Sequence, residues 1–195
     1  PAKDKALRAM AARLEADESA ILAANGKDVD AVGKSFEGDV KKDRMKAAVA
    51  RVRMTGDFIK EMAERLRVIA DLPDPVGAVT ARWERPDGFQ VERVRVPIGV
   101  IGIISELSSL VTVESIGLCL KSGNLCVFRG ASEWRLTHQA IEKSLREAGE
   151  KNGVPTGSWI VIDRPEKEIA LELMRSGKSL DAIIPRGGAG LRKTV

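Results

Sequence analysis

The spacing of hydrophobic residues changes twice along the chain. Up to residue 72, apolar residues recur three and four positions apart, as in Leu7, Met10, Ala11 and Leu14, which predicts amphipathic helices. From 79 to 96 apolar and polar residues alternate on either side of a turn, which predicts a β-hairpin. After residue 97, short apolar runs alternate with helical patterns, which predicts a parallel α/β sheet.

The N-terminal region is predicted to form several helices. Asp17 is a plausible N-cap for the second helix, Asn25-Gly26 is expected to end it, and another turn or two can follow at 28–34. The stretch 39–52 is predicted to be a charged helix with one apolar face. Thr55 or Asp57 is expected to cap the next and last helix of this region. The prolines after Asp71 are expected to end that helix.

The predicted hairpin turns at Pro86-Asp87-Gly88. A change in the alternation between Val91 and Val94 indicates a β-bulge in the return strand. The apolar face of a two-stranded hairpin has to be buried, either against its own chain or against a partner.

The central unit begins with a buried strand at Ile98–Ile104, continues through a helix at Val111–Leu120 and returns in a strand at Leu125–Phe128. Such βαβ units bind ligands beyond the carboxyl ends of their strands. The elements expected next are a helix at Glu133–Ala148, a strand at Trp159–Ile162, a helix at Pro165–Met174, a strand at Leu180–Ile184 and a helix from Leu191.

Composition and charge bear on four possibilities, which are nucleic-acid binding, membrane insertion, cysteine chemistry and metal binding. The net charge of +4 is spread along the chain without a basic stripe, so a nucleic-acid partner is not indicated. No apolar run is long enough for a membrane span and no secretory signal is evident, so a cytoplasmic location is the default. Cys119 and Cys126 fit buried, inert positions. His138 lacks neighbours at ligand spacing, so a metal site is unsupported and a half-exposed helix residue is expected.

Four motifs carry a resemblance. They read P-I-G-V-I-G-I-I (97–104), C-L-K-S-G-N (119–124), R-G-A-S-E (129–133) and D-A-I-I-P-R-G-G-A-G-L (181–191). In this order they resemble the γ-glutamyl phosphate reductases, a branch of the aldehyde dehydrogenase superfamily. The resemblance implies that the chain is the N-terminal part of a longer enzyme whose nucleophilic cysteine lies beyond Val195.

The implied architecture has three parts. Residues 1–78 are the helical part of the cofactor domain, 79–96 form an oligomerisation arm, and 97–195 form an incomplete Rossmann-like domain. The implied activity is NADP-dependent reduction of L-glutamyl 5-phosphate to L-glutamate 5-semialdehyde with phosphate release, a step of proline biosynthesis, in a homo-oligomer. The alternative is a non-catalytic domain of the same fold that binds a nucleotide or a protein partner.

The candidate cofactor residues follow two strands. Arg129, Gly130 and Ser132 follow a buried strand, where a cation and a hydroxyl suit a ribose or its 2′-phosphate; the alternative is a surface ion pair of Arg129 with Glu133. The second set is Arg186, Gly187 and Gly188, in a strand-to-helix loop where glycines allow close approach to a phosphate; a simple tight turn is the alternative. By position alone, Asp163-Arg164-Pro165 is expected to flank the adenine.

The candidate substrate residues are Ser105, Glu106 and Ser108. In the resembling family this loop usually reads Y-E-S/A-R-P-N-V-T, and this chain has serines and leucine where the family has R-P-N. Arginine suits an acyl phosphate or a carboxylate through its two-pronged donor group, and serine does not supply that charge. The resemblance is therefore stronger on the cofactor side than on the substrate side.

Overall fold

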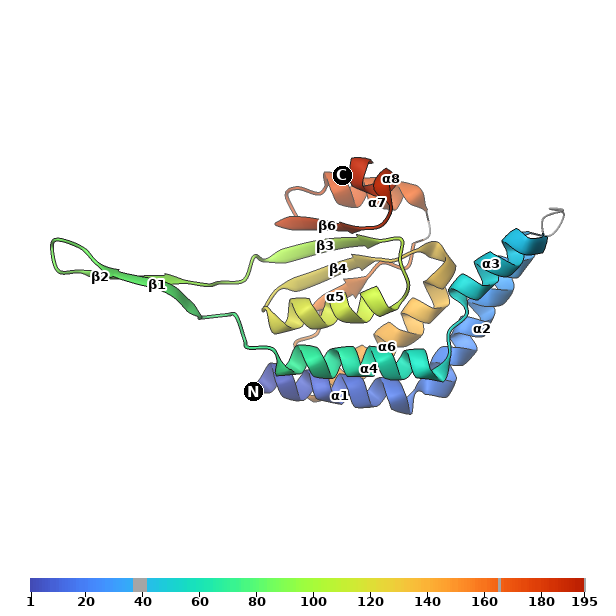
Figure 1. Ribbon diagram of the computed structural model, residues 1–195, viewed down its shortest axis with the longest axis horizontal. Coiled ribbons are helices and arrows are strands. Elements are labelled where there is room, and N and C mark those ends of the chain that lie inside the picture. Colours follow the sequence, from blue (N-terminus) through green and yellow to red (C-terminus); the bar gives the residue numbers. More distant parts are fainter. Residues whose placement is uncertain (37–41, 165, 195) are drawn as a thin grey trace.

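The computed structural model describes residues 1–36, 42–164 and 166–194. It confirms the predicted α/β class: a four-stranded parallel sheet is covered by helices, and a separate two-stranded antiparallel hairpin projects from this body (Figure 1). The helices are α1 (Ala2–Ala16), α2 (Glu18–Lys34), α3 (Lys42–Val52), α4 (Gly56–Asp71), α5 (Leu110–Lys121), α6 (Arg135–Lys151), α7 (Lys167–Arg175) and α8 (Ala189–Thr194). The strands are β1 (Val79–Glu84), β2 (Gln90–Val94), β3 (Val100–Ser105), β4 (Leu125–Arg129), β5 (Trp159–Val161) and β6 (Ala182–Arg186).

The parallel sheet has the strand order β5-β4-β3-β6, so β3 is paired on both sides. Ile101 lies opposite Cys126 on β4 and Ala182 on β6. Because all four strands are parallel, their carboxyl ends meet at one edge of the sheet. The fourth strand lies two residues later than predicted, so Arg186 ends β6 rather than opening the loop.

Helices α5 and α6 pack beside the sheet, and α1 and α4 lie behind them (Figure 1). The predicted inward face of α1 is confirmed, and α4 likewise buries one face, with Ile59 buried and Phe58 half-buried. The largest fully buried side chains are Phe128, Leu7, Met10, Leu14, Ile21, Ile59, Met62, Leu66, Ile104, Ile116, Ile141 and Leu145. One continuous core therefore joins the N-terminal helices to the sheet.

The predicted helix end at Asn25-Gly26 is wrong, because α2 continues to Lys34. Asn25 is buried, and its amide nitrogen donates to the carbonyl of Val52 at 2.9 Å and to the hydroxyl of Thr137 at 3.2 Å. Its amide oxygen accepts from the backbone N–H of Met54 at 2.8 Å. These long-range bonds outweigh the local tendency of Asn-Gly to end a helix.

Of the two predicted helix N-caps, Thr55 makes a capping hydrogen bond and Asp17 does not. Thr55 precedes α4 and its hydroxyl accepts from the N–H of Phe58 at 3.4 Å, as expected of an N-cap. Asp17 precedes α2 but its carboxylate makes no capping bond and instead accepts from Arg13 at 2.6 Å and Ser144 at 2.7 Å. The expected helix starts at Asp39 and Pro165 lie outside the described residues.

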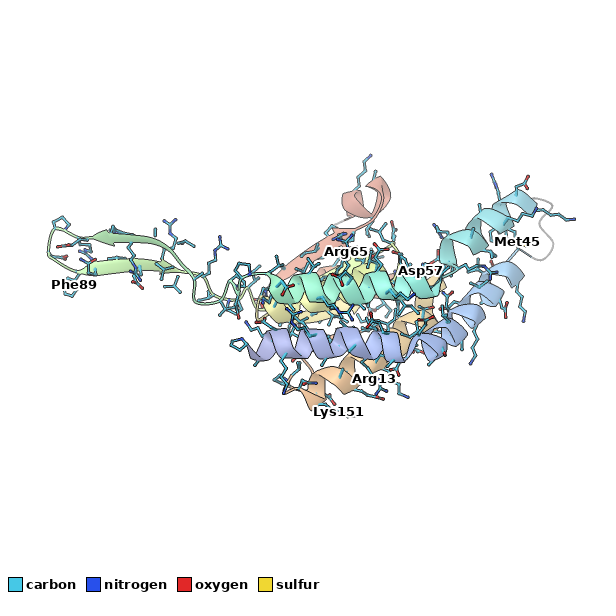
Figure 2. The ribbon with its side chains drawn as sticks, turned by 60° about the horizontal axis from the view of Figure 1, so that its bottom comes forward. Arg13, Met45, Asp57, Arg65, Phe89 and Lys151 are labelled. Carbon is cyan, nitrogen blue, oxygen red and sulfur yellow. The ribbon has the colours of Figure 1, made fainter. Side chains whose placement is uncertain are left out.

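The hairpin is confirmed, with Trp83 opposite Val91. Its register shift lies between Val79 and Ala81 on β1, so the bulge predicted on the return strand was assigned to the wrong strand. Phe89 at the tip is 69% exposed and Trp83 is 45% exposed. The ribbon extends away from the helices, with Phe89 at its far end (Figure 2), so its apolar side chains are not covered by the described part of the chain.

Candidate functional site

Four loops converge at the carboxyl edge of the sheet, one after each parallel strand. They begin after Ser105 on β3, Arg129 on β4, Val161 on β5 and Arg186 on β6. Every candidate site residue that the structure describes lies at this edge, and Pro165 is outside the described residues. The structure divides them into two groups, one at β3 and β6 and one at β4 and β5.

The first group joins the substrate and cofactor loops. Ser105 lies opposite Arg186, and the N–H of Glu106 donates to the carbonyl of Arg186 at 2.9 Å. The Glu106 carboxylate accepts from the N–H of Gly188 at 3.2 Å. A Cβ at Gly187 would overlap that carboxylate, so a side chain at this position would have to displace the Glu106 carboxylate.

The side chains of the substrate loop are placed unequally. Ser105 is fully buried, and its hydroxyl accepts from the N–H of Leu107 at 3.1 Å. Ser108 is half-buried and Glu106 is exposed. Ser109 and Thr112 at the start of α5 have buried hydroxyls that lack a hydrogen-bond partner within the described residues. Nothing in the sequence distinguishes these two hydroxyls, and they stand out only because they are buried in the folded chain.

The second group surrounds a small hollow between the ends of β4 and β5. Its lining comes from the loop after β4 (Gly130, Ala131, Ser132), from the first turns of α6 (Arg135, His138, Gln139) and from residues 161–164 around the end of β5. Arg135 donates to both carboxylate oxygens of Asp163, at 2.6 and 3.2 Å, and Gln139 also donates to Asp163. The hydrogen bond to Asp163 raises the pKa of Arg135, so this guanidinium stays charged.

The expected surroundings of His138 were wrong. It is 4% exposed, and its ring stands edge-on to Phe128 with 5.8 Å between ring centroids. Burial lowers the pKa of His138 to about 4, so the imidazole is neutral at pH 7. The spacing of His138 to Ile141 and Leu145 matches one helix face and is the sequence signal for this burial.

Arg129 ends a buried strand, as expected. It is 8% exposed, lies at the end of β4 and is not among the residues lining the hollow. Glu133, its suggested partner, pairs with Arg51 at 2.8 Å and accepts from the hydroxyl of Ser132 at 3.2 Å. Of the predicted residues after β4, Gly130 and Ser132 therefore reach the hollow.

In the part of the chain that the structure describes, there is no candidate metal site, no accessible thiol and no membrane-spanning helix. That part contains no group of three histidine, cysteine or acidic residues that could hold a metal ion. Cys119 and Cys126 are both buried, and their mutual hydrogen bond together with burial raises the pKa of Cys126 well above that of an ordinary thiol. Among residues 1–36, 42–164 and 166–194, no helix is long and apolar enough to cross a membrane.

An edge of this kind, with ligand loops after parallel strands, is typical of dinucleotide-binding domains. Residues 4–190 match the model of the aldehyde dehydrogenase family, and the chain belongs to that family.

More specifically, the chain is similar to γ-glutamyl phosphate reductases, which confirms the resemblance found in the motifs. It is 44% identical to the enzyme of Heliobacterium modesticaldum, covering 99% of this chain and 45% of the relative. It is 46% identical to that of Moorella thermoacetica, covering 99% of this chain and 44% of the relative. The crystal structure of the Thermotoga maritima γ-glutamyl phosphate reductase superposes with a TM-score of 0.88 at 38% identity, covering 99% of this chain and 46% of that chain. This chain thus spans less than half the length of these relatives.

Proposed function

We propose that this chain is the nucleotide-binding part of an enzyme that reduces L-glutamyl 5-phosphate to L-glutamate 5-semialdehyde with NADPH and releases phosphate. The single observation that carries the proposal is the convergence of both predicted loop groups at one edge of the parallel sheet. The similarity to γ-glutamyl phosphate reductases along 99% of the chain supports the substrate assignment.

The hollow between β4 and β5 is assigned to the adenosine side of the nucleotide. Gly130 brings the main chain close to it, Ser132 offers a hydroxyl, and the guanidinium groups of Arg135 and Arg164 lie at its rim, where they pair with Asp163 and Glu166. Guanidinium groups favour a phosphorylated ribose, because they form charge-assisted hydrogen bonds with phosphate oxygens. Arg129 lies buried at the end of β4, next to Gly130 in the chain, and stays a candidate for holding the ribose or its 2′-phosphate.

The loops after β3 and β6 are assigned to the reacting end. When bound, the nicotinamide nucleotide supplies the hydride. Glu106 holds Gly187 and Gly188 beside the substrate loop through its bond to the Gly188 N–H. Ser105 fixes the turn of that loop, and Ser108 faces the same edge of the sheet as a candidate contact for the acyl phosphate. The attacking thiol is assigned to the part of the relatives that this chain does not span.

The hairpin is assigned to self-association. It projects from the body (Figure 1). Its apolar side chains, among them Trp83, Phe89 and Val94, are exposed, as in an arm that packs on a second copy. We propose a homo-oligomer assembled through residues 79–96.

Nucleotide binding is tested by calorimetric titration of the chain with NADPH and NADH. Ser132→Asp places a negative charge on the loop that borders the hollow, and it is expected to weaken NADPH binding by roughly tenfold and NADH binding less, because the 2′-phosphate is repelled. Ser179→Asp is the matched control, because Ser179 is exposed in the turn before β6, at the opposite edge of the sheet. Equal effects of the two variants, or no binding to the unaltered chain, would contradict the proposed cofactor site.

A further inference from the structure

The start of α6 is fixed in place by a buried aspartate of α2. Asp28 is 5% exposed and accepts from the N–H of Leu136 at 3.1 Å. It also accepts from the N–H and the hydroxyl of Thr137, at 2.8 and 2.7 Å. A carboxylate that receives three hydrogen bonds at the first turn of a helix holds that turn firmly.

The same turns of α6 reach both walls of the hollow. On the β5 side, Arg135 and Gln139 hold Asp163. On the β4 side, the ring of His138 lies so close to Gly130 that a Cβ on this glycine would overlap Cε1 and Nδ1 of the imidazole. A helix anchored to α2 is therefore in contact with the two loops that face each other across the hollow.

His138 acts on the loop through its shape. Its ring is enclosed between Phe128 and the main chain of Gly130, and its Nε2 forms no hydrogen bond within the described residues. Gly130 has no positive φ, so its backbone conformation is open to other residues and the space beside it is what excludes a side chain. The glycine of the R-G-A-S-E motif is therefore explained by the histidine eight residues later.

We infer that His138 is a positioning residue: by packing against Gly130 it sets the distance of the Gly130–Ser132 loop from Asp163 and thereby the fit of a nucleotide ribose in the hollow. This inference rests on the proposed function, which places the nucleotide there. It adds a residue that, besides lining the hollow, controls affinity through the position of the loop.

The test is a double-mutant cycle on the full chain with NADPH as the probe. His138→Ala is expected to weaken binding about tenfold, because the loop loses its support. Gly130→Ala is expected to weaken it as well, because the new methyl group meets the ring. The double variant is expected to bind roughly threefold or more tightly than Gly130→Ala alone, since removing the ring makes room for the methyl group.

Ile141→Ala is the matched control, since Ile141 is fully buried on the same helix and does not line the hollow. It is expected to lower stability without changing NADPH affinity. Hydrogen exchange at the amides of Ala131 and Ser132 gives a second readout, expected to be faster in His138→Ala and unchanged in Ile141→Ala.

The outcomes separate the two proposals. An unaltered chain that binds no NADPH contradicts the proposed function, and the exchange rates at the loop still decide whether His138 holds it. Unchanged loop exchange in His138→Ala, or an NADPH affinity equal to that of Ile141→Ala, would overturn the positioning role.

Discussion

At the scale of single residues, two buried ionisable groups are accommodated in opposite ways. Lys121, in the C-L-K-S-G-N motif, is 4% exposed, and its ammonium donates to the carboxylate of Asp4 and to the carbonyl of Ala70 at 2.8 Å. These two bonds join α5 to α1 and α4. His138 instead is buried as a neutral ring. The lysine therefore contributes through its bonds and the histidine through its shape.

Lys121→Met is expected to destabilise the chain by about 1–3 kcal/mol, because the buried carbonyl of Ala70 loses its donor. The free energy of unfolding in urea measures this. Lys151→Met is the control at the exposed end of α6 (Figure 2) and is expected to change stability by less than about 0.5 kcal/mol. Equal stabilities of the two variants would show that the Lys121 bonds contribute nothing net.

His138, the only histidine of the chain, predicts a pH dependence of stability. Its pKa is about 4 in the folded state and near 6.5 when unfolded, so between these values the unfolded chain binds more protons. Its contribution is complete above pH 6.5 and decreases as the pH falls towards 4, by about 2 kcal/mol between pH 7 and pH 5. Arg135, which borders the same hollow and whose pKa is raised by its hydrogen bond to Asp163, keeps its charge over this range.

Urea unfolding at pH 7 and pH 5 is the measurement for this prediction. In His138→Asn the difference between the two pH values should largely disappear, because the titrating group is gone. A variant with the same pH dependence as the unaltered chain would assign the effect to other groups.

At the scale of elements, the hairpin is the part that the rest of the described chain does not cover. If it is the self-association arm, Phe89→Ser is expected to weaken association about tenfold, because a side chain that is 69% exposed in the single chain loses its burial against a partner. Light scattering over a concentration series measures this. Gln90→Ser, a neighbouring exposed and polar position, is the control. A monomer at every concentration, with or without Phe89, would leave the arm without this role.

At the scale of the whole molecule, the chain holds the proposed nucleotide site without an accessible thiol among its described residues. Cys119 and Cys126 are 5% and 1% exposed and lie in the core. We expect no oxidation of NADPH that depends on glutamyl phosphate when this chain is assayed alone, even where NADPH binds. Absorbance of the reduced nicotinamide follows the reaction. Turnover by the chain would show that the nucleophile lies within it.

Local sequence determined the elements and the edge at which the site lies. Periodicities of 3.6 and 2 are set by burial of one face, so they identified the helices, the hairpin and the parallel strands. The loops that follow parallel strands lie at one edge of the sheet, so the sequence alone predicted that Ser105, Gly130 and Gly187 lie at the same edge. Several helices and strands begin or end one to three residues from the predicted positions, as β6 does by ending at Arg186. At such positions the local turn residues favour one boundary and strand pairing favours another.

Only the tertiary structure decided which side chains meet. Asn25 continues a helix because its partners come from Val52, Met54 and Thr137, far along the chain. His138 is buried because α6 turns this face towards Gly130, and no local pattern specifies that glycine as its neighbour. Long-range packing and hydrogen bonding supply more free energy at these positions than local propensity, so the sequence around each residue could not predict which partners it meets.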